Sequence, residues 1–360
     1  MTRPSLSREK LANDLLWMAM LLLGTLIGLA LIIRLCGQNP AIALGALWRG
    51  AAGSHTALAA TATRASILAF YALGIAIGFR AGTLNIGAEG QSRIGAALAT
   101  ALGTGAAGTM LASAGPLGIV IVLLGGAIAG ALWSLLAGVL RAWRGVPDVI
   151  STLMLNFIAL ELVRFFLSSP AWLRGPGSEQ KSDFIAEPMR LEQWETQFHP
   201  ILITALLAIA AAHFFLFYTP SGMALRAAGL NPIAALNCGL RIQRLQLGSF
   251  AIAGALAGFA GALSVLGLWH LGSAPTYPDY GFMAIAVALV ANLQPLRILP
   301  AAILFGGLEV GAKSMQGSAN VSYWVVHLVE GLIILAILLR GVQVFQKQTG
   351  EPTSAAEAAA

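Results

Sequence analysis

A short polar connection, RAAGLNPIAALNCGLRIQRLQ (residues 226–246), joins two apolar runs and gives the strongest indication of the fold. The run before it is ILITALLAIAAAHFFLFY (201–218), and the run after it continues to residue 268. As helices, both runs are long enough to cross a hydrocarbon layer of about 30 Å. The stretch therefore predicts two membrane-spanning helices joined by a short segment at one membrane face.

The polar connection itself has the sequence of a compact helix with both ends marked. Asn231 is a good N-cap, and Pro232 sits at the first helical position, where its missing N–H costs nothing. Ile233 to Cys238 gives about a turn and a half, and Gly239 can end the helix in a left-handed conformation. We therefore expect a short helix between the two spans.

The surroundings of this helix suggest a docking role. Arg226, Arg241 and Arg244 bracket it, and positive charge beside a membrane span indicates the cytoplasmic side. Ala234 and Ala235 would offer a small face that another surface could approach closely. The alternative is an ordinary loop that contains one helical turn.

Composition excludes two broad classes of protein. Hydrophobic residues make up 58% of the chain and charged residues only 10%, whereas about a quarter of a soluble domain is charged. The net charge of +6 is spread over short loops, which fits a membrane protein better than a nucleic-acid-binding one. Many of the 41 glycines lie inside apolar stretches, as in closely packed membrane helices.

Apolar runs recur along the chain and predict an all-α polytopic membrane protein with about eight to ten transmembrane helices over residues 1–345. The tail, residues 346–360, is expected to be disordered and cytoplasmic. Residues 41–63 are weakly apolar and predict an interfacial or re-entrant helix. The expected spans lie near 15–35, 65–79, 94–114, 117–140, 149–168, 201–218, 246–268, 282–296, 299–316 and 321–340.

Charge and span parity agree on the orientation. With a cytoplasmic N-terminus, the loop 169–200 falls outside, and it has no basic excess. Arg34, Arg49 and Arg64 run against the positive-inside rule, so the first hundred residues are the weakest part of this topology.

No motif for chemistry stands out. The chain has no G-x-x-x-x-G-K-[ST] phosphate loop, so it cannot hydrolyse ATP by itself. No histidine, cysteine and carboxylate cluster has metal-site spacing, and no Ser/His/Asp set sits at one membrane face. We expect no catalytic residues, no metal and no cofactor.

Polar residues within apolar surroundings are the candidate solute-pathway residues. Asn85, Glu89 and Gln91 lie in RAGTLNIGAEGQSRIGAALAT (80–100), which is either a broken membrane helix or a plain cytoplasmic loop. Asn156 can hydrogen-bond across helices or face a solute path. Trp269 fits an interfacial aromatic belt or a stacking platform for a flat ring.

Four segments in this order resemble the permeases of bacterial ABC importers of the branched-chain amino acid/ribose type. Within that family they are most similar to the nucleoside (purine) importers fed by basic membrane lipoproteins. The resemblance runs from about residue 60 to 340. The segments are RAGTLNIGAEGQ (80–91), GVPDVISTLMLNFIAL (145–160), RAAGLNPIAALNCGL (226–240) and YGFMAIAVALVANLQPLRILPAAILFGGL (280–308).

The resemblance implies a role for the short helix. Residues Gly229 to Gly239 match the family's coupling helix, which docks on the cytoplasmic ATPase subunit. Ile233 departs from the polar or charged residue usual there, so side-chain contacts at that edge can differ. The expected coupling residues are Gly229, Asn231, Pro232, Ile233, Ala234, Ala235 and Gly239.

The resemblance also implies partners and a location. These are an ABC ATPase, a second homologous permease chain that forms a heterodimer, and an external or lipoprotein substrate-binding protein. The location is the bacterial cytoplasmic membrane, and no nucleic acid is expected. A nucleoside or nucleobase is the favoured solute. The alternatives are a ribose-type sugar importer, an ion-coupled secondary transporter and a membrane scaffold.

Overall fold

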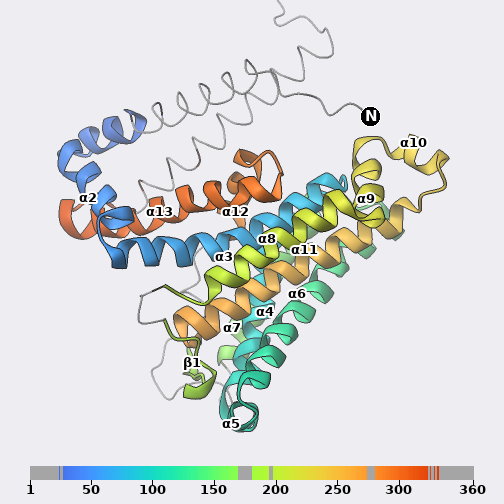
Figure 1. Cartoon of the computed structure of the whole chain (residues 1–360), viewed down its shortest axis with the longest axis horizontal. Coiled ribbons are helices and arrows are strands. Elements are labelled where there is room, and N and C mark those ends of the chain that lie inside the picture. Colours follow the sequence, from blue (N-terminus) through green and yellow to red (C-terminus); the bar gives the residue numbers. More distant parts are fainter. Residues whose placement is uncertain are drawn as a thin grey trace, which may run out of the picture. The chain divides into compact units, whose positions relative to one another are not determined.

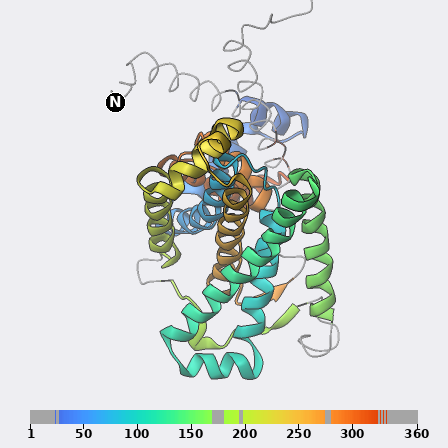
Figure 2. The same cartoon turned by 90° about the vertical axis from the view of Figure 1, so that its right-hand side faces the viewer.

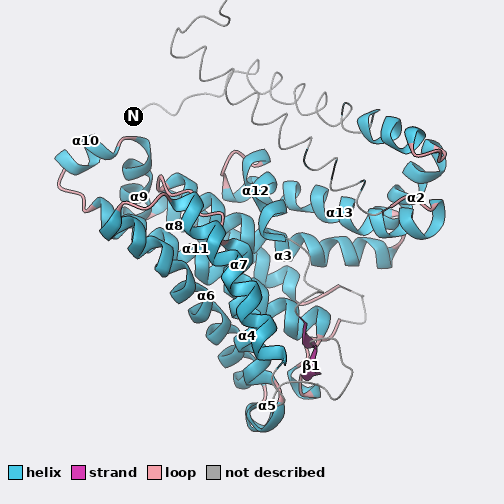
Figure 3. Ribbon diagram, turned by 180° about the vertical axis from the view of Figure 1, so that it is seen from behind, coloured by secondary structure: helices cyan, strands magenta, loops and turns pink. Residues whose placement is uncertain are grey.

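The computed structural model describes residues 27–168, 181–193, 198–273 and 280–322, with single residues at 24, 325, 328 and 331. The chain divides into two compact units, Met1–Ser54 with Leu308–Ala360, and His55–Gly307. Helices make up almost all of the described part, as Figure 3 shows. The prediction of an all-α protein is therefore confirmed.

Six described helices are long and apolar enough to cross a membrane, or seven if one bent pair counts as a span. The predicted spans at 15–35 and 321–340 lie largely outside the described residues. The six are α3 (His55–Arg80), α6 (Pro116–Arg144), α7 (Asp148–Ser168), α8 (Ile201–Tyr218), α11 (Ile242–Ser264, continued by the π-helix η2, Val265–Trp269) and α13 (Pro295–Ala319).

The start of α3 differs from the prediction. The expected helix over 41–63 is instead divided between α2 (Pro40–Ala52) and the first turns of α3. The Asn39 side chain caps α2 by accepting from the Ala41 N–H at 3.0 Å, and Gly53 ends it. The small residues after His55 contain no helix breaker, so α3 begins ten residues before the predicted span.

One predicted span is bent in the structure, and another is too short. The span at 94–114 is two helices, α4 (Ala88–Gly103) and α5 (Gly105–Ser113), bent by 75° at the Gly-Thr-Gly break. The span at 282–296 is α12 (Tyr280–Val290), whose 11 residues rise only about 16 Å. Positive φ angles at Asn292 and Leu293 end it before α13 begins.

Helices α6 and α11 pack along a seam of glycines, side by side in Figures 1 and 2. Gly126 and Gly130 on α6 face Gly254 and Gly258 on α11, each pair spaced i, i+4. A Cβ at Gly258 would overlap the Gly126 carbonyl, and one at Gly254 would overlap the Gly130 carbonyl. Backbones therefore touch, as in the small-xxx-small packing of membrane helices.

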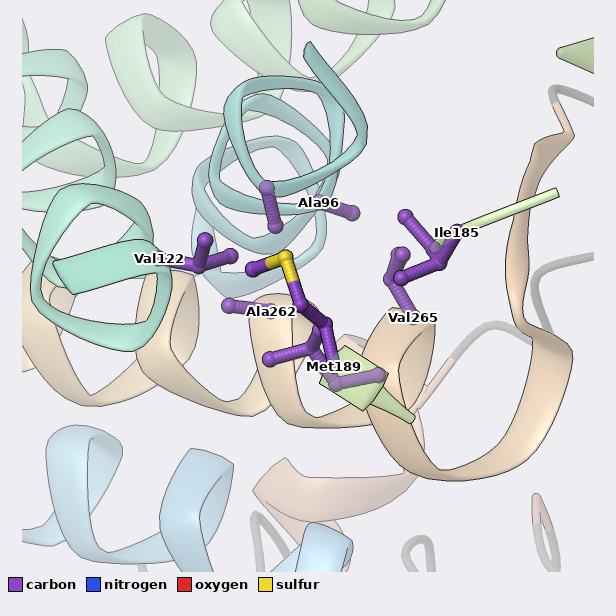
Figure 4. Close-up of a cluster of buried hydrophobic side chains, with 8 residues drawn as sticks. Ala96, Val122, Ile185, Met189, Ala262 and Val265 are labelled. Atoms are coloured by element: carbon purple, nitrogen blue, oxygen red, sulfur yellow. The ribbon is translucent and has the colours of Figure 1, made fainter. Parts of the chain in front are cut away.

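The described part of the predicted external loop folds onto the opposite end of α11 from α10. Strand β1 (Lys181–Phe184) pairs antiparallel with β2 (Leu271–Ser273), and the short helix η1 (Glu187–Met189) follows. Figure 4 shows the apolar cluster beneath this loop, which joins it to α4, α6, α11 and η2. Its labelled members are Ala96, Val122, Ile185, Met189, Ala262 and Val265.

Candidate functional site

The predicted coupling helix forms as α10 (Pro232–Asn237), preceded by α9 (Pro220–Leu230). The Asn231 side chain accepts from the Ala234 N–H at 3.0 Å, which caps the helix. Cys238 is the C-cap, and Gly239 follows with φ of +80°. The end signals identified in the sequence therefore act as expected, and the helix begins at Pro232 as predicted and ends one residue earlier.

The exposed face of α10 is more apolar than expected. Ala235 is 4% exposed, so the prediction that it belongs to an open docking face is wrong. Ala234 is exposed, and its neighbours Ile233 and Leu236 are 75% and 62% exposed. This face therefore combines one small residue with two large apolar ones.

Gly229 connects the region of α10 to the end of α3. It lies so close to the chain after α3 that a Cβ there would overlap the Arg80 carbonyl and meet the Gly82 nitrogen at 2.9 Å. The Arg80 guanidinium donates to the Leu293 carbonyl at 2.7 Å, beyond the end of α12. The end of α9 thus bears directly on the stretch 81–87 that leads into α4.

Alternate residues of the stretch from Ala81 to Gly87, and the first turns of α4, are buried. Asn85, Glu89 and Gln91 are 1%, 4% and 2% exposed, which does not fit the alternative of a plain surface loop. Asn85 and Gln91 pair through both amides at 2.9 and 3.3 Å, and the Asn85 oxygen also accepts from the Gly87 N–H at 2.9 Å. These two amides thus hold the irregular backbone in shape.

Side chains on one face of α7 provide partners for the same irregular backbone. The Leu84 N–H donates to Asp148 at 3.0 Å, and the Ile86 N–H donates to the Thr152 hydroxyl at 3.3 Å. Arg141 forms an ion pair with Asp148. The four-residue spacing of the α7 side chains matches the two-residue spacing of the N–H groups in the extended stretch.

Asn156 continues this face one turn further along α7. Its oxygen accepts from the Gly90 N–H at 2.8 Å, and its nitrogen donates to the Ile86 carbonyl at 3.1 Å. Irregular backbone inside a membrane bundle needs such partners because no water supplies them. In this structure the Asn156 amide is therefore engaged by backbone groups.

Glu89 connects α4 to α12. One carboxylate oxygen pairs with the Arg93 Nε at 3.0 Å, and the other accepts from the Gly281 N–H at 2.8 Å at the start of α12. The carboxylate thus meets a guanidinium and a helix N-terminus, both of which stabilise negative charge. This pairing explains how a carboxylate can be buried here.

Trp269 lies among aromatic and basic residues. The Arg64 guanidinium carbon is 5.3 Å from the Trp269 ring centroid, and Arg64 Nη1 donates to the Tyr280 hydroxyl at 2.8 Å. The Tyr71 and Tyr280 rings meet edge to face at 6.3 Å. Of the predicted solute-pathway residues, Trp269 belongs to this cluster, and Glu89 adjoins it through its ion pair with Arg93. The other three instead form hydrogen bonds around the stretch 81–87 and the first turn of α4; they are Asn85, Gln91 and Asn156.

The π-helix that carries Trp269 is held by the loop preceding α8. The Gly267 carbonyl accepts from His199 Nε2 at 3.0 Å, and the Leu266 carbonyl accepts from the Leu191 N–H at 2.9 Å. The other ring nitrogen of His199 accepts from the Ile201 N–H at 3.3 Å. Burial lowers the pKa of His199, which keeps the ring neutral.

Sequence reasoning missed Arg64, Asp148 and Thr152 as parts of these sites. For Arg64 a signal existed, because it ran against the positive-inside rule. For Asp148 and Thr152 the signal was their spacing from Asn156 at four-residue steps on one helix face.

The permease component of the branched-chain amino acid transport system is the family whose model matches residues 57–338. The chain belongs to this permease family. The permease is 31% identical to a guanosine ABC transporter permease protein of Bacillus subtilis, over 91% of this chain and 94% of that one.

Other relatives carry different solute names. The permease is 30% identical to a nucleoside ABC transporter permease protein of Lactococcus lactis, over 88% of both chains. It is 27% identical to a glucose ABC transporter permease protein of Haloferax volcanii, over 83% of this chain and 80% of that one. No solved structure gives a significant match to the chain.

Proposed function

We propose that this chain is the membrane-spanning permease of an ATP-driven importer and that its solute is a nucleoside or nucleobase. The observation that carries the proposal is the similarity to a guanosine permease over nearly the full length of both chains. The capped, exposed α10 supports it, because a chain without a phosphate loop needs a surface on which a separate ATPase can act.

The route of coupling follows from the packing of the His55–Gly307 unit. A partner ATPase that closes on ATP would push α10, and α9 would move with it. The close approach of Gly229 to Arg80 and Gly82 would pass this movement to the stretch 81–87. At the far end of that stretch, Glu89 holds the start of α12 and the Arg93 side chain. The stretch 81–87 and the start of α4 would thus connect the coupling helix to the solute pathway.

The proposed assembly has further parts. A second permease chain, which we propose to be a homologue rather than a copy, would complete the pathway. An external or lipoprotein-anchored binding protein would deliver the solute, and the bacterial cytoplasmic membrane would be the location. Six helices of membrane-crossing length support a multi-pass membrane protein.

A sugar is the second candidate solute, since a glucose permease is among the relatives. The aromatic cluster around Trp269 and Tyr280 favours a flat ring, because base stacking on aromatic side chains is a general mode of nucleobase binding. An ion-coupled transporter would need unpaired carboxylates, whereas Glu89 pairs with Arg93.

The test is uptake of labelled guanosine by proteoliposomes that contain the permease with its partner subunits. ATP-dependent uptake that survives a protonophore is expected, and uptake that persists without the ATPase would contradict the proposal. Ala234→Glu should abolish uptake by placing a charge on the exposed face of α10. Gln243→Glu adds the same charge on an exposed residue just beyond α10 and should leave uptake near the wild-type rate.

A further inference from the structure

Arg64 occupies an unusual position for a membrane arginine. It lies within α3, sixteen residues before Arg80, which places it about 24 Å along the helix axis from the end that meets α9. Charged residues within spans are costly and generally functional. The positive-inside rule therefore does not explain the position of Arg64, and the explanation must come from its contacts.

Those contacts bring together three elements of the His55–Gly307 unit. The guanidinium lies over the Trp269 ring at 5.3 Å from its centroid, and Nη1 donates to the Tyr280 hydroxyl at 2.8 Å. Trp269 ends the π-helix η2, and π-helical turns are frequent at functional sites. Arg64 thus ties α3 to the ends of η2 and α12 that face each other.

The space beside this contact is closed. A cavity of about 10 Å³ remains, which is room for no more than about one water molecule. Its lining is aromatic and polar, and Arg93 supplies a second guanidinium, which Glu89 neutralises. The lining residues are Tyr71, Ser92, Arg93, Ala96, Gly261, Ser264, Trp269 and Tyr280.

We propose that Arg64 takes the place of the solute ring in this closed form and selects among purines in the open form. The planar guanidinium lies on the Trp269 face where a nucleobase would stack. When the site opens, the base replaces it on that face, and Arg64 turns to the edge of the base. This inference rests on the proposed nucleoside transport and adds a residue and a preference to it.

The preference follows from donor and acceptor chemistry. A guanidinium offers five N–H donors and no acceptor. Guanine and hypoxanthine present two adjacent acceptors, O6 and N7, which a guanidinium can bind with two hydrogen bonds. Adenine replaces the O6 acceptor with an amino donor, which opposes the donors of Arg64. The site should therefore accept guanosine and inosine in preference to adenosine.

The experiment is competition for labelled guanosine uptake by the full transporter, with unlabelled inosine or adenosine as competitor. The same binding protein serves every variant, so a change in preference between variants comes from the permease. Wild type should favour inosine over adenosine, and Arg64→Gln should reduce that preference about tenfold, the value of one good two-bond contact. Arg164→Gln is the matched control, since Arg164 is an exposed span arginine paired with Glu161.

Arg64→Lys keeps the charge but loses the planar fork, so it should reach the membrane in normal amounts and also lose the preference. Wild-type preference in either Arg64 variant would overturn the proposal, and so would equal competition by inosine and adenosine in wild type. Absence of any nucleoside uptake in wild type would instead refute the proposed function. Reduced uptake of every nucleoside with an unchanged preference would show a structural role and overturn the selectivity.

Discussion

Asn156→Leu should destabilise the permease without changing which solute it prefers. The substitution is close in size and removes both hydrogen bonds of the Asn156 amide, to the Gly90 N–H and the Ile86 carbonyl. Ile86 belongs to the irregular stretch that leads into α4, and Gly90 lies in the first turn of α4. Neither gains another partner from leucine.

The magnitude follows from the burial of the two groups left behind. A buried group without a partner costs about 1–3 kcal/mol, and Gly90 is buried whereas Ile86 is partly exposed. The loss should therefore total about 2–4 kcal/mol in the free energy of unfolding. For a chain of 360 residues, with an unfolding entropy of about 2 cal/mol/K per residue, that corresponds to a fall of about 3–5 °C in melting temperature.

The assay is the thermal unfolding of detergent-purified protein, together with guanosine uptake at a temperature well below the transition. Met154→Leu is the control, because Met154 lies on the same helix with 48% of its surface exposed. The control should melt within a degree or two of wild type. At low temperature, Asn156→Leu should retain the wild-type Michaelis constant for uptake.

A normal melting temperature with a raised Michaelis constant would refute this reasoning. It would place Asn156 in contact with the solute, which is the alternative that the sequence left open.

Three further predictions concern other contacts. Gly258→Val should lower the free energy of unfolding by about 1–3 kcal/mol or more, because the new side chain meets the Gly126 carbonyl. Gly248→Ala, with open space around it, should be near neutral. Equal melting temperatures of the two variants would contradict the glycine seam. Gly229→Ala should lower uptake per ATP hydrolysed, since a Cβ there displaces Arg80 and Gly82, and an unchanged ratio would remove Gly229 from the coupling route. Burial lowers the pKa of His199 in the folded chain, so the unfolded chain binds a proton first as pH falls below about 6.5. The free energy of unfolding is therefore highest above that pH and declines toward pH 5. His199→Gln should show a smaller decline in melting temperature over this range, and an identical decline would exclude His199 as its source.

The sequence predicted the helices whose signals are local and continuous. Asn231, Pro232 and Gly239 carry the geometry of α10 in their own backbone preferences, so its bounds were predicted within one residue. The long apolar runs of α6, α7 and α8 were also found, because helix length in a membrane is set by its thickness.

The errors arose where tertiary contacts replace the membrane as the surroundings of an apolar segment. α12 is apolar but short, and most of its residues are buried against protein, so hydropathy overestimated its length. Ala235 looked like part of an open face because composition does not reveal which side of a short helix packs inward. The backbone partners of Asn156, at Gly90 and Ile86, lie 66 and 70 residues away in the chain, which no local pattern encodes.

The shortness of α12 has a consequence for how the chain is made. Its 11 residues rise about half the thickness of the hydrocarbon layer, so an insertion machinery that recognises full-length apolar segments has little reason to release it into lipid alone. The Gly281 N–H in its first turn pairs with Glu89, a residue synthesised almost two hundred positions earlier. α12 should therefore settle late in biogenesis, after α3 and α4 are in place, and the Glu89 oxygen that is not paired with Arg93 would gain its contact with Gly281 only then.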